Sequence, residues 1–410
     1  MADIPKIRFK GFTEPWEQRK LGEICSRVQG NDGRMELPTL TISAANGWMK
    51  QEDRFSGNIA GKEQKNYTLL HKGELSYNHG NSKLAKYGTV FSLQTYEEAL
   101  VPRVYHSFKV EIGSADFIEY YFATKMPDRE LRKLISSGAR MDGLLNIGYD
   151  DFMGIKMMFP SVLEQDKIAE YFRAFDHLIT LHQRKCDDTK ELKKYMLQKM
   201  FPKNGEKFPE IRFKGFTEAW EQRKLGGMAS LITKGTTPLD KSNTGVVNFV
   251  KIESIDESSG NITITQKISL DEHNGYLHRS QLKENDILFS IAGTLGRVTS
   301  VKSSILPANT NQALAIIRLK DGCLDYVKTY LKGKAVADFI KKNPTIGAQP
   351  NLSLEQVANL EIAIPSEDEQ KKIGAFFQQL DNLITLHQRK CDTLKELKKY
   401  MLQNMFPKKG

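Results

Sequence analysis

The feature that most constrains this 410-residue chain is an internal repeat. Residues 7–22 return as residues 211–226 with a single change, and residues 178–186 return unchanged as residues 383–391. The offset between the copies is 204 residues for the first pair and 205 for the second, which is half of the chain. A repeat with this period determines the architecture before any local pattern does, because each half must build the same supporting frame.

Two inserts lie between the repeated segments, the first insert at about residues 25–145 and the second insert at about residues 228–350. Their sequences barely resemble each other, although Lys72–Tyr77 weakly parallels Glu284–Phe289. We therefore expect the inserts to share a fold but not a surface. A constant frame around two different inserts predicts a scaffold that presents two distinct binding domains.

Each half ends in a segment with heptad spacing. Apolar or small residues recur in alternating steps of four and three from Ile168 to Met200, and again from Ile373 to Met405. One position in each row is a lysine that breaks the seam, Lys193 in the first and Lys398 in the second. This spacing is typical of a coiled coil and predicts two helices, each roughly 55 Å long. We expect the two helices to pair antiparallel, which buries both apolar seams. The alternative is that each helix packs only on its own insert.

The inserts have the pattern of mixed α/β domains. In each, an amphipathic helix is expected, at Asp116–Phe122 and at Asp325–Leu331, with the aspartate as its N-cap. Short runs rich in β-branched residues predict strands; they are Pro38–Ser43, Gly88–Ser92, Val246–Ile252, Asn261–Thr265, Asp286–Ile291 and Ala313–Arg318.

The predicted fold class is α+β, with two α/β domains separated by two long antiparallel coiled-coil helices and related by a pseudo-two-fold repeat. The expected boundaries place the first α/β domain at 1–160, the central helical region at 161–203, the second α/β domain at 204–364 and the C-terminal helical region at 365–410.

Composition narrows the function classes. A net charge of +10 favours a polyanionic partner, although a lysine-rich surface on an ordinary protein gives the same value. No apolar run is long enough for a membrane span and no signal segment stands at the start, so we expect a cytoplasmic protein without a membrane partner. The four cysteines form no CxxC pair, which indicates neither a disulfide framework nor a zinc ribbon.

Along essentially its whole length the chain resembles the specificity (S) subunits of type I restriction-modification systems. The resemblance rests on the duplicated Gly-Phe-Thr-Glu-x-Trp-Glu-Gln-Arg-Lys-Leu-Gly block and the two long helices. It rests also on three motifs of the second insert, Lys234–Pro238, Asp286–Gly296 and Asn309–Gln312.

The resemblance implies a non-catalytic subunit that recognises double-stranded DNA. Each α/β domain is then a target-recognition domain for one half of a split, asymmetric site, and the helices set the spacer. Two methyltransferase (M) subunits are expected to dock on the helices, and motor-nuclease (R) subunits to join through this core of one S and two M subunits. No cofactor is expected on this chain, because S-adenosylmethionine, ATP and magnesium belong to the partner subunits.

Polar, glycine-containing turns are the candidate DNA contacts in the second insert. Small hydroxyl groups and exposed backbone amides suit close approach to phosphates and base edges. Asparagine and glutamine can read adenine in a major groove, and arginine can read guanine. The candidates are Lys234, Thr236, Thr237, Gly293, Thr294, Arg297, Asn311, Gln312 and, in a second loop, Gln349. The alternative for each residue is a role in the turn itself.

The first insert lacks the Gly-Thr-Thr-Pro turn, and Gln29–Gly33 stands roughly in its place. A dense polar and basic loop provides its candidate contacts, which are Asn78, His79, Asn81, Ser82, Lys83, Lys86 and Tyr87, with Arg140 in a second loop. A solvated surface loop is the alternative. The mismatch between the inserts predicts that the two half-sites differ in sequence.

A histidine and a cysteine four residues apart lie on each heptad seam, His182 with Cys186 and His387 with Cys391. If the helices pair in register, the four side chains can meet as a Cys2His2 zinc set. We prefer the alternative that they fill the centre of the coiled coil, and expect no metal site.

Two other function classes compete with DNA recognition. The first is an independent methyltransferase or nuclease with a cryptic site, although the chain has no Walker A motif and no glycine-rich turn for S-adenosylmethionine. The second is a structural coiled-coil adaptor, which predicts no DNA affinity at low salt.

Overall fold

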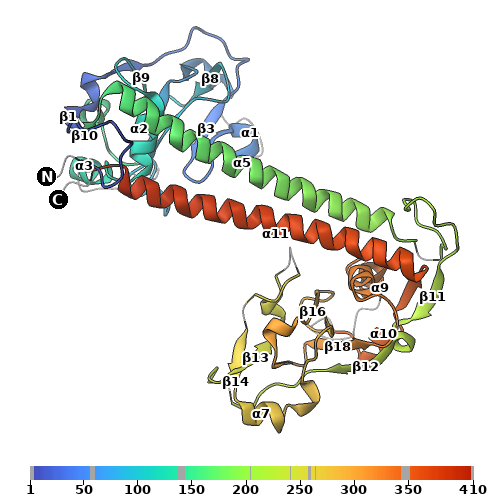
Figure 1. The fold of residues 1–410 in the computed structure, drawn as a ribbon. Helices are drawn as coiled ribbons and strands as arrows, with labels where there is room; N and C mark the ends of the chain where they lie inside the picture. Colours follow the sequence, from blue (N-terminus) through green and yellow to red (C-terminus); the bar gives the residue numbers. More distant parts are fainter. Residues whose placement is uncertain are drawn as a thin grey trace. The chain divides into compact units, whose positions relative to one another are not determined.

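The computed structural model describes residues 4–55, 61–135, 144–203, 205–240, 242–256, 260–263, 265–342 and 351–407. The chain forms two compact units. Unit 1 comprises Met1–Thr180 with Asp392–Gly410, and unit 2 comprises Leu181–Cys391. Figure 1 shows the two long helices, α5 (Val162–Lys199) and α11 (Glu367–Asn404), each of which contributes residues to both units.

Unit 1 contains a four-stranded sheet in the order β2-β9-β6-β7 and three two-stranded pairs. The sheet strands are β2 (Cys25–Val28), β9 (His106–Val110), β6 (Leu75–Asn78) and β7 (Thr89–Ser92). The pairs are β1 (Glu17–Lys20) with β10 (Lys156–Phe159), β3 (Leu40–Ser43) with β4 (Gly47–Lys50), and β5 (Thr68–His71) with β8 (Glu98–Val101). The shorter helices are α1 (Gln51–Phe55), α2 (Ala115–Ala123), α3 (Asp128–Leu134) and α4 (Tyr149–Met153).

Unit 2 repeats the four-stranded sheet and the pair at its N-terminal segment, but has one three-stranded sheet where unit 1 has two further pairs. Its four-stranded sheet has the order β12-β18-β15-β16, formed by β12 (Ala229–Lys234), β18 (Leu314–Leu319), β15 (Ile287–Ser290) and β16 (Val298–Ser300). A second sheet joins β14 (Gln266–Ile268), β13 (Val247–Val250) and β17 (Ala308–Thr310), and β11 (Glu221–Lys224) pairs with β19 (Glu361–Ile364). The helices are α6 (Leu225–Met228), α7 (Leu270–Asn274), α8 (Leu324–Leu331), α9 (Lys334–Lys342) and α10 (Leu354–Ala358).

The expected correspondence between Lys72–Tyr77 and Glu284–Phe289 is confirmed, because these segments lead into β6 and β15, which occupy the same place in the two sheets. The inserts therefore share a fold. Most of the expected strands are also present. The exception is Asn261–Thr265, where Ile262 forms only an isolated bridge to Ile255.

The expected N-caps were wrong in both amphipathic helices. The Ser114 hydroxyl caps α2, because it accepts a hydrogen bond from the amide of Phe117. Helix α8 begins after Cys323, which makes no side-chain cap. Asp325 lies within the first turn of α8, where its carboxylate pairs with Lys328 at 2.7 Å.

Both long helices have 38 residues and pair antiparallel within each unit. In unit 2, His182 contacts His387 while Lys193, further along α5, contacts Asp381, further back along α11. Lysine at a seam position is explained by this pairing, since its ammonium group reaches a carboxylate on the partner helix. The repeat-related Lys398 makes the same contact with Asp176 in unit 1.

The repeated aromatic residues form the centre of each core. Trp16, Phe117, Phe172 and Phe406 pack together in unit 1. Their counterparts in unit 2 are Trp220, Tyr326, Phe377 and Phe201. Each helix thus packs on insert residues as well as on the other helix. The expected pairing is confirmed, and the alternative that each helix packs only on its own insert was wrong.

The repeated N-terminal segment is held by the same contacts in both units. The guanidinium of Arg8 donates two hydrogen bonds of 2.7 Å to the buried carboxylate of Glu164, and Arg212 does the same to Glu369 at 2.7 and 2.8 Å. The amide of Ile7 donates to the carbonyl of Asn404 at the end of α11. In unit 2, Ile211 bonds to Lys199 at the end of α5 in the same way.

A bilayer span requires a long apolar helix. Within the described residues no helix meets that requirement.

Candidate nucleic-acid interface

Three separate motifs of the second insert meet at one end of its four-stranded sheet. Lys234 ends β12 opposite Ala315 of β18, and Ser290 ends β15 opposite Leu314 of the same strand. Because β18 is antiparallel to both neighbours, the turns after β12 and β15 lie beside the turn before β18. We call this end of the sheet, with residues 234–237, 293–294 and 311–312, the second edge.

Close backbone contact holds the turns of the second edge together. A Cβ atom at Gly235 would lie 2.0 Å from the carbonyl oxygen of Thr310, so only glycine fits there. The amide of Thr236 donates to the same carbonyl at 3.0 Å, and the hydroxyl of Thr237 donates to the side-chain oxygen of Gln312. The sequence motif Gly-Thr-Thr-Pro is thus needed to dock one turn on the next.

The predicted contact residues of the second edge differ in exposure. Asn311 is half-buried and its side-chain oxygen accepts a hydrogen bond from the amide of Ala313. Thr236 is half-buried. The exposed residues are Lys234, Thr237, Gly293, Thr294 and Gln312.

Arg297 does not lie where the sequence analysis expected. Its guanidinium turns back into the protein and contacts the carbonyl oxygens of Ile252 and Ile255, each at 3.4 Å. The reason is local, since the amide of Arg297 is held by the hydroxyl of Ser290 at 2.7 Å. Arg297 therefore supports the turn after β15 in this conformation.

The first insert has an equivalent end of its sheet. Its strands β2 and β6 end beside the start of β9, in the same arrangement as β12, β15 and β18. We call this end, with residues 29–32, 81–87 and 102–103, the first edge. Asn81, Ser82, Lys83 and Lys86 are exposed here, and Tyr87 is half-buried with the Lys86 ammonium 5.7 Å from its ring centre. Asn78 is tied inward by a hydrogen bond to the carbonyl of Ile42.

His79 was expected on the polar loop, but it is a buried packing residue with only 4% of its surface exposed. Its ring lies 4.8 Å from the ring of His106 and 6.0 Å from that of Tyr77. Its carbonyl accepts from Leu145, as the carbonyl of Ile291 accepts from Leu352 in the second insert. His79 thus occupies the place of a buried isoleucine, and the exposed loop begins after it.

Burial also changes the chemistry beneath the first edge. It lowers the pKa of His106, whose Nε2 lies 2.8 Å from the carbonyl oxygen of Ile147. Burial raises the pKa of Tyr149 to about 12, and the guanidinium of Arg27 lies 4.4 Å from the centre of its ring. His106 and Tyr149 therefore stay neutral near pH 7 and form a packed base for the edge.

Sequence reasoning missed Arg103. This exposed residue lies in the connection between β8 and β9. The amide of Tyr105 closes the turn onto the carbonyl of Pro102, as Leu314 closes onto Asn311. Arg103 consequently takes the position of Gln312. The only signal in the sequence was a Pro-Arg pair between two strand-like runs.

Arg140 and Gln349, predicted in the second loop of each insert, lie outside the described residues. They remain predictions.

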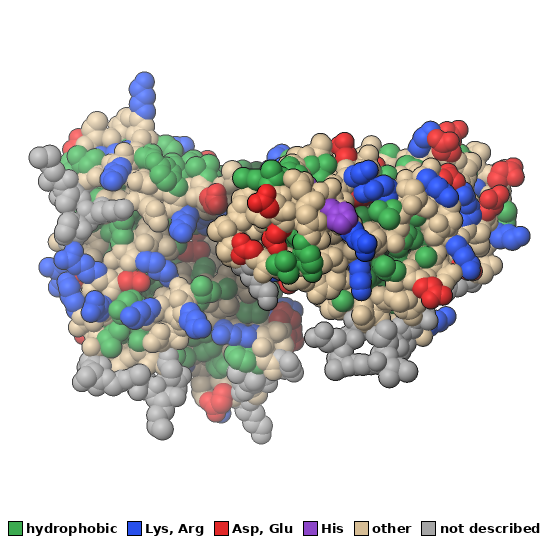
Figure 2. Space-filling view, turned by 90° about the horizontal axis from the view of Figure 1, so that it is seen from below, with side chains coloured by type: hydrophobic (Ala, Val, Ile, Leu, Met, Phe, Trp, Pro, Cys, Tyr) green, Lys and Arg blue, Asp and Glu red, His purple; other side chains and the backbone are tan. Residues whose placement is uncertain are grey.

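Charge alone does not mark the interface. In the face shown in Figure 2, Lys and Arg side chains are spread over the surface and interrupted by acidic groups. Strand topology and polar turns therefore mark the two edges, and no single basic patch does so on this face.

The helical seam does not assemble a zinc set. His182 and His387 meet with their Nδ1 atoms 3.0 Å apart. The thiol of Cys186 lies 3.8 Å from Gln388, and that of Cys391 lies 3.7 Å from Gln183. Over the described ranges, no three His, Cys, Asp or Glu side chains are grouped to hold a metal ion.

Comparison with known proteins gives consistent matches. Residues 217–396 match the family described as "Type I restriction modification DNA specificity domain". The type I restriction enzyme MjaVIII specificity subunit of Methanocaldococcus jannaschii is 23% identical over 301 residues, covering 70% of this chain and 68% of that protein. The putative MjaX specificity subunit of the same organism is 23% identical over 422 residues, covering 98% and 90%.

Solved structures share the fold. The crystal structure of a type I restriction-modification S subunit from M. genitalium aligns with a TM-score of 0.64 at 14% identity, covering 99% of this chain and 100% of that one. A chain from a study of complex assembly and conformational transition of the type I R-M system aligns with a TM-score of 0.50 at 15% identity, covering 97% and 99%.

Proposed function

Because the chain belongs to the specificity subunits of type I restriction-modification systems, we propose that it recognises a two-part DNA sequence, one half with each insert. The observation that supports this most is the pair of edges. The two sheets have the same strand order, yet their edges present different polar residues. Equivalent position with different chemistry is what two unlike half-sites require.

Each edge combines groups for base reading with groups for phosphate contact. At the second edge, Asn311 and Gln312 offer amide groups that match adenine, while Lys234 suits phosphate. At the first edge, Arg103 matches guanine, and Lys83 and Lys86 suit phosphate. The first half-site should therefore depend on guanine more than the second does.

The long helices are proposed to set the spacer between the half-sites. A helix of 38 residues is about 57 Å long, whereas one turn of B-DNA is about 34 Å. Deleting one heptad from α5 and one from α11 removes roughly 10 Å from each. We expect a spacer shortened by about three base pairs, with both half-sites unchanged. A methylated sequence with the original spacing would contradict the ruler role.

The same helices carry a repeated apolar surface suited to two copies of one partner. Three pairs of repeat-related residues are each between 41% and 55% exposed; they are Leu178 with Leu383, Leu192 with Leu397, and Tyr195 with Tyr400. Exposed apolar groups that recur at the repeat offset indicate two equivalent interaction sites. We assign these sites to two methyltransferase subunits, through which motor-nuclease subunits join the complex.

This assignment has a direct test. Leu192→Asp and Leu397→Asp should each leave a complex with one methyltransferase subunit in place of two, and the double variant should bind none. Mass measurement of the purified complexes distinguishes these outcomes. Two subunits bound to the double variant would place docking elsewhere.

Catalysis is proposed to lie outside this chain. S-adenosylmethionine, ATP and magnesium are then held by the partner subunits, and the complex acts on chromosomal DNA in the cytoplasm. The purified chain incubated alone with DNA, S-adenosylmethionine and magnesium should neither methylate nor cleave. Turnover without partners would favour the independent-enzyme alternative.

The test of the whole proposal is methylation-sensitive sequencing of host DNA with and without the gene. We expect one asymmetric two-part motif to lose methylation when the gene is removed. An unchanged set of methylated motifs would contradict DNA recognition, as would the absence of salt-dependent DNA binding by the assembled complex.

A further inference from the structure

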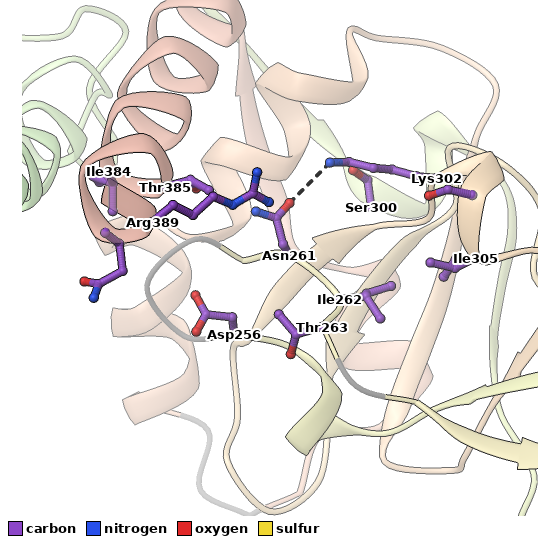
Figure 3. Close-up of a pocket in the computed structure, with 12 residues that line it drawn as sticks. Asp256, Asn261, Ile262, Thr263, Ser300, Lys302, Ile305, Ile384, Thr385 and Arg389 are labelled. Atoms are coloured by element: carbon purple, nitrogen blue, oxygen red, sulfur yellow. Dashed lines mark hydrogen bonds between the residues drawn. The ribbon is translucent and has the colours of Figure 1, made fainter. Parts of the chain in front are cut away.

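Unit 2 has a polar cavity whose lining residues are not part of the second edge. It has a volume of about 540 Å³ and lies between α11 and loops of the second insert, as Figure 3 shows. A second hollow of about 330 Å³ shares Asn261, Ser300, Lys302, Thr385 and Arg389 with it. Together they form one recess, which we call the α11 recess. Volumes of this size are typical of small-molecule sites.

Cations outnumber anions in the α11 recess. Its walls include Lys302, Lys328, Lys332 and Arg389 against two carboxylates, Asp256 and Asp381. Lys328 is already paired with Asp325 at 2.7 Å, and Lys302 donates to the side-chain oxygen of Asn261 at 3.3 Å. Figure 3 shows Arg389 extending from α11 toward Asn261. Among the ion pairs between described residues, none includes Arg389.

Lys332 is a mostly enclosed cation whose counter-charge is distant. Its side chain is 19% exposed, and its ion-pair partner in the described structure is Asp381 at 3.9 Å. That carboxylate is also bound by Lys193 of α5. Burial, reinforced by Lys193, lowers the pKa of Lys332 to about 8. Lys332 thus shares one carboxylate with Lys193, and a mostly buried ammonium group is destabilised unless a further anion binds beside it.

Lys332 and the loop at Gly260 line the smaller hollow together, and that hollow is the space open to an anion. A Cβ atom at Gly260 would lie 2.6 Å from the Lys332 ammonium, and Gly260 adopts a φ of +68°. Glycine at this position therefore keeps the loop close to the ammonium group without covering it.

The recess belongs to unit 2 and is not required by the fold. When α2 is matched to α8 through their equivalent aromatic residues, Phe117 and Tyr326, Lys332 corresponds to Ala123 and Lys328 to Glu119. The same frame thus folds in unit 1 without these lysines.

The recess is also separate from the second edge. Ser300, in its wall, lies opposite Ile287, at the start of β15, whereas the second edge follows Ser290, at the end of β15. A DNA backbone at the edge would reach exposed side chains, whereas Lys332 is mostly enclosed. A small anion fits this enclosure better than a duplex does.

We propose that the α11 recess binds a phosphate-bearing small molecule of the pyrophosphate class, held by Lys302, Lys332 and Arg389. Two adjoining hollows with cations in both favour two linked phosphates over one. The proposal is independent of which DNA sequence the chain reads.

The test is isothermal titration of the full chain with pyrophosphate at pH 7. We expect saturable one-to-one binding that is weakened at least tenfold by Arg389→Ala and by Lys332→Met. Arg184→Ala is the matched control, because Arg184 is the exposed repeat counterpart of Arg389 and does not line the recess. Its affinity should equal that of the unaltered chain. Circular dichroism establishes that each variant is folded.

Three results would overturn the proposal. They are absence of saturable binding, equal affinity in the Arg389→Ala variant, and equal weakening by Arg184→Ala. If pyrophosphate fails to bind while Arg389→Ala reduces the salt dependence of DNA binding, the cation contacts a DNA phosphate and the small-molecule site is rejected. As a second readout, the affinity should fall as the pH rises through about 8, because Lys332, facing Lys193, Lys328, Asp325 and Asp381, then loses its proton.

Discussion

The first and second edges occupy the same place in two sheets of identical strand order, yet they share almost no side chains. The repeated frame around the edges, in contrast, keeps both its residues and their contacts. Arg8–Glu164 and Arg212–Glu369 have the same partners and nearly the same distances. Packing and buried charge thus fix the repeated residues, while the edges are free to differ because their side chains lie in solvent.

A buried residue beneath the edge can also differ if its volume is accommodated. His79 stands where Ile291 stands, and the adjoining strand position holds His106 in one insert and Ala315 in the other. Two imidazole rings with centres 4.8 Å apart thus pack where the second insert has isoleucine and alanine. The two inserts therefore build the same fold with different buried side chains.

The strongest test of the constant frame is to remove one carboxylate at a time. Glu164→Gln and Glu369→Gln each leave a mostly buried guanidinium without its counter-charge, which costs about 3 kcal/mol. Because the two sites have equal geometry, we expect nearly equal losses in the free energy of unfolding. Urea denaturation of the two variants measures this.

Exposed ion pairs provide the control. Lys371→Ala removes a partner of Glu367 at the surface and should leave the free energy of unfolding almost unchanged, because solvent screens an exposed ion pair. Losses that differ by more than about 1 kcal/mol between the two buried sites would show that the frame is not equivalent in the two halves.

Substitutions at the two edges should affect the two half-sites independently. Arg103→Ala and Gln312→Ala remove side chains at equivalent positions, and each should reduce base discrimination by about 2 kcal/mol in its own half-site only. Methylation profiling against a library of altered half-sites reports both effects at once. If either substitution relaxes both half-sites, or neither, then the equivalence of the edges is wrong.

The sequence predicted the architecture because its strongest signals are repeated. The heptad seam and the paired helices both follow from residues that recur at a fixed offset. The sequence predicted less well which residue caps a helix. Ser114 rather than Asp116 caps α2, since a cap depends on the backbone conformation of one residue.

The candidate site was predicted at the level of motifs and not of single side chains. Residues 234–237 contact residues 310–312 because β12 pairs with β18. The sequence of the second insert alone does not show which strands pair. His79 and Arg297 looked like contact residues because composition cannot show which way a side chain turns. Arg103 was overlooked because nothing in the first insert aligned it with Gln312.

Lowering the pH should destabilise the first insert more than the second. Burial holds the pKa of His106 below its ordinary value of 6.5, so the unfolded chain binds more protons than the folded one as the pH falls below about 6.5. The first insert should lose stability on acidification, whereas Ala315, at the equivalent position, contributes no such dependence. Thermal melts at pH 7.5 and 5.5 measure the loss.

The matched variant is His106→Gln, which keeps a donor toward the carbonyl of Ile147 but does not titrate. The loss of melting temperature between the two pH values should be smaller in this variant. His387, whose pKa is also lowered by burial, titrates on the helical seam in both proteins and cancels from the difference. An identical loss in both proteins would rule out His106 as the source.

The smallest effect is expected from moving the chain ends, which tests whether the two halves are interchangeable. The contact of Ile7 with Asn404 at the end of α11 reproduces that of Ile211 with Lys199 at the end of α5, so the segment near the start of this chain is held as the segment after residues 203–210 is held (Figure 1). A circular permutant that begins near residue 205, with the original ends joined by a short flexible linker, keeps every frame contact. Its stability should change by less than about 1 kcal/mol, or roughly 2–4 °C in melting temperature, and both half-sites should be read as before. Failure to fold would mean that the connection through residues 203–210 does more than join the halves, and loss of one half-site alone would mean that the ends take part in recognition.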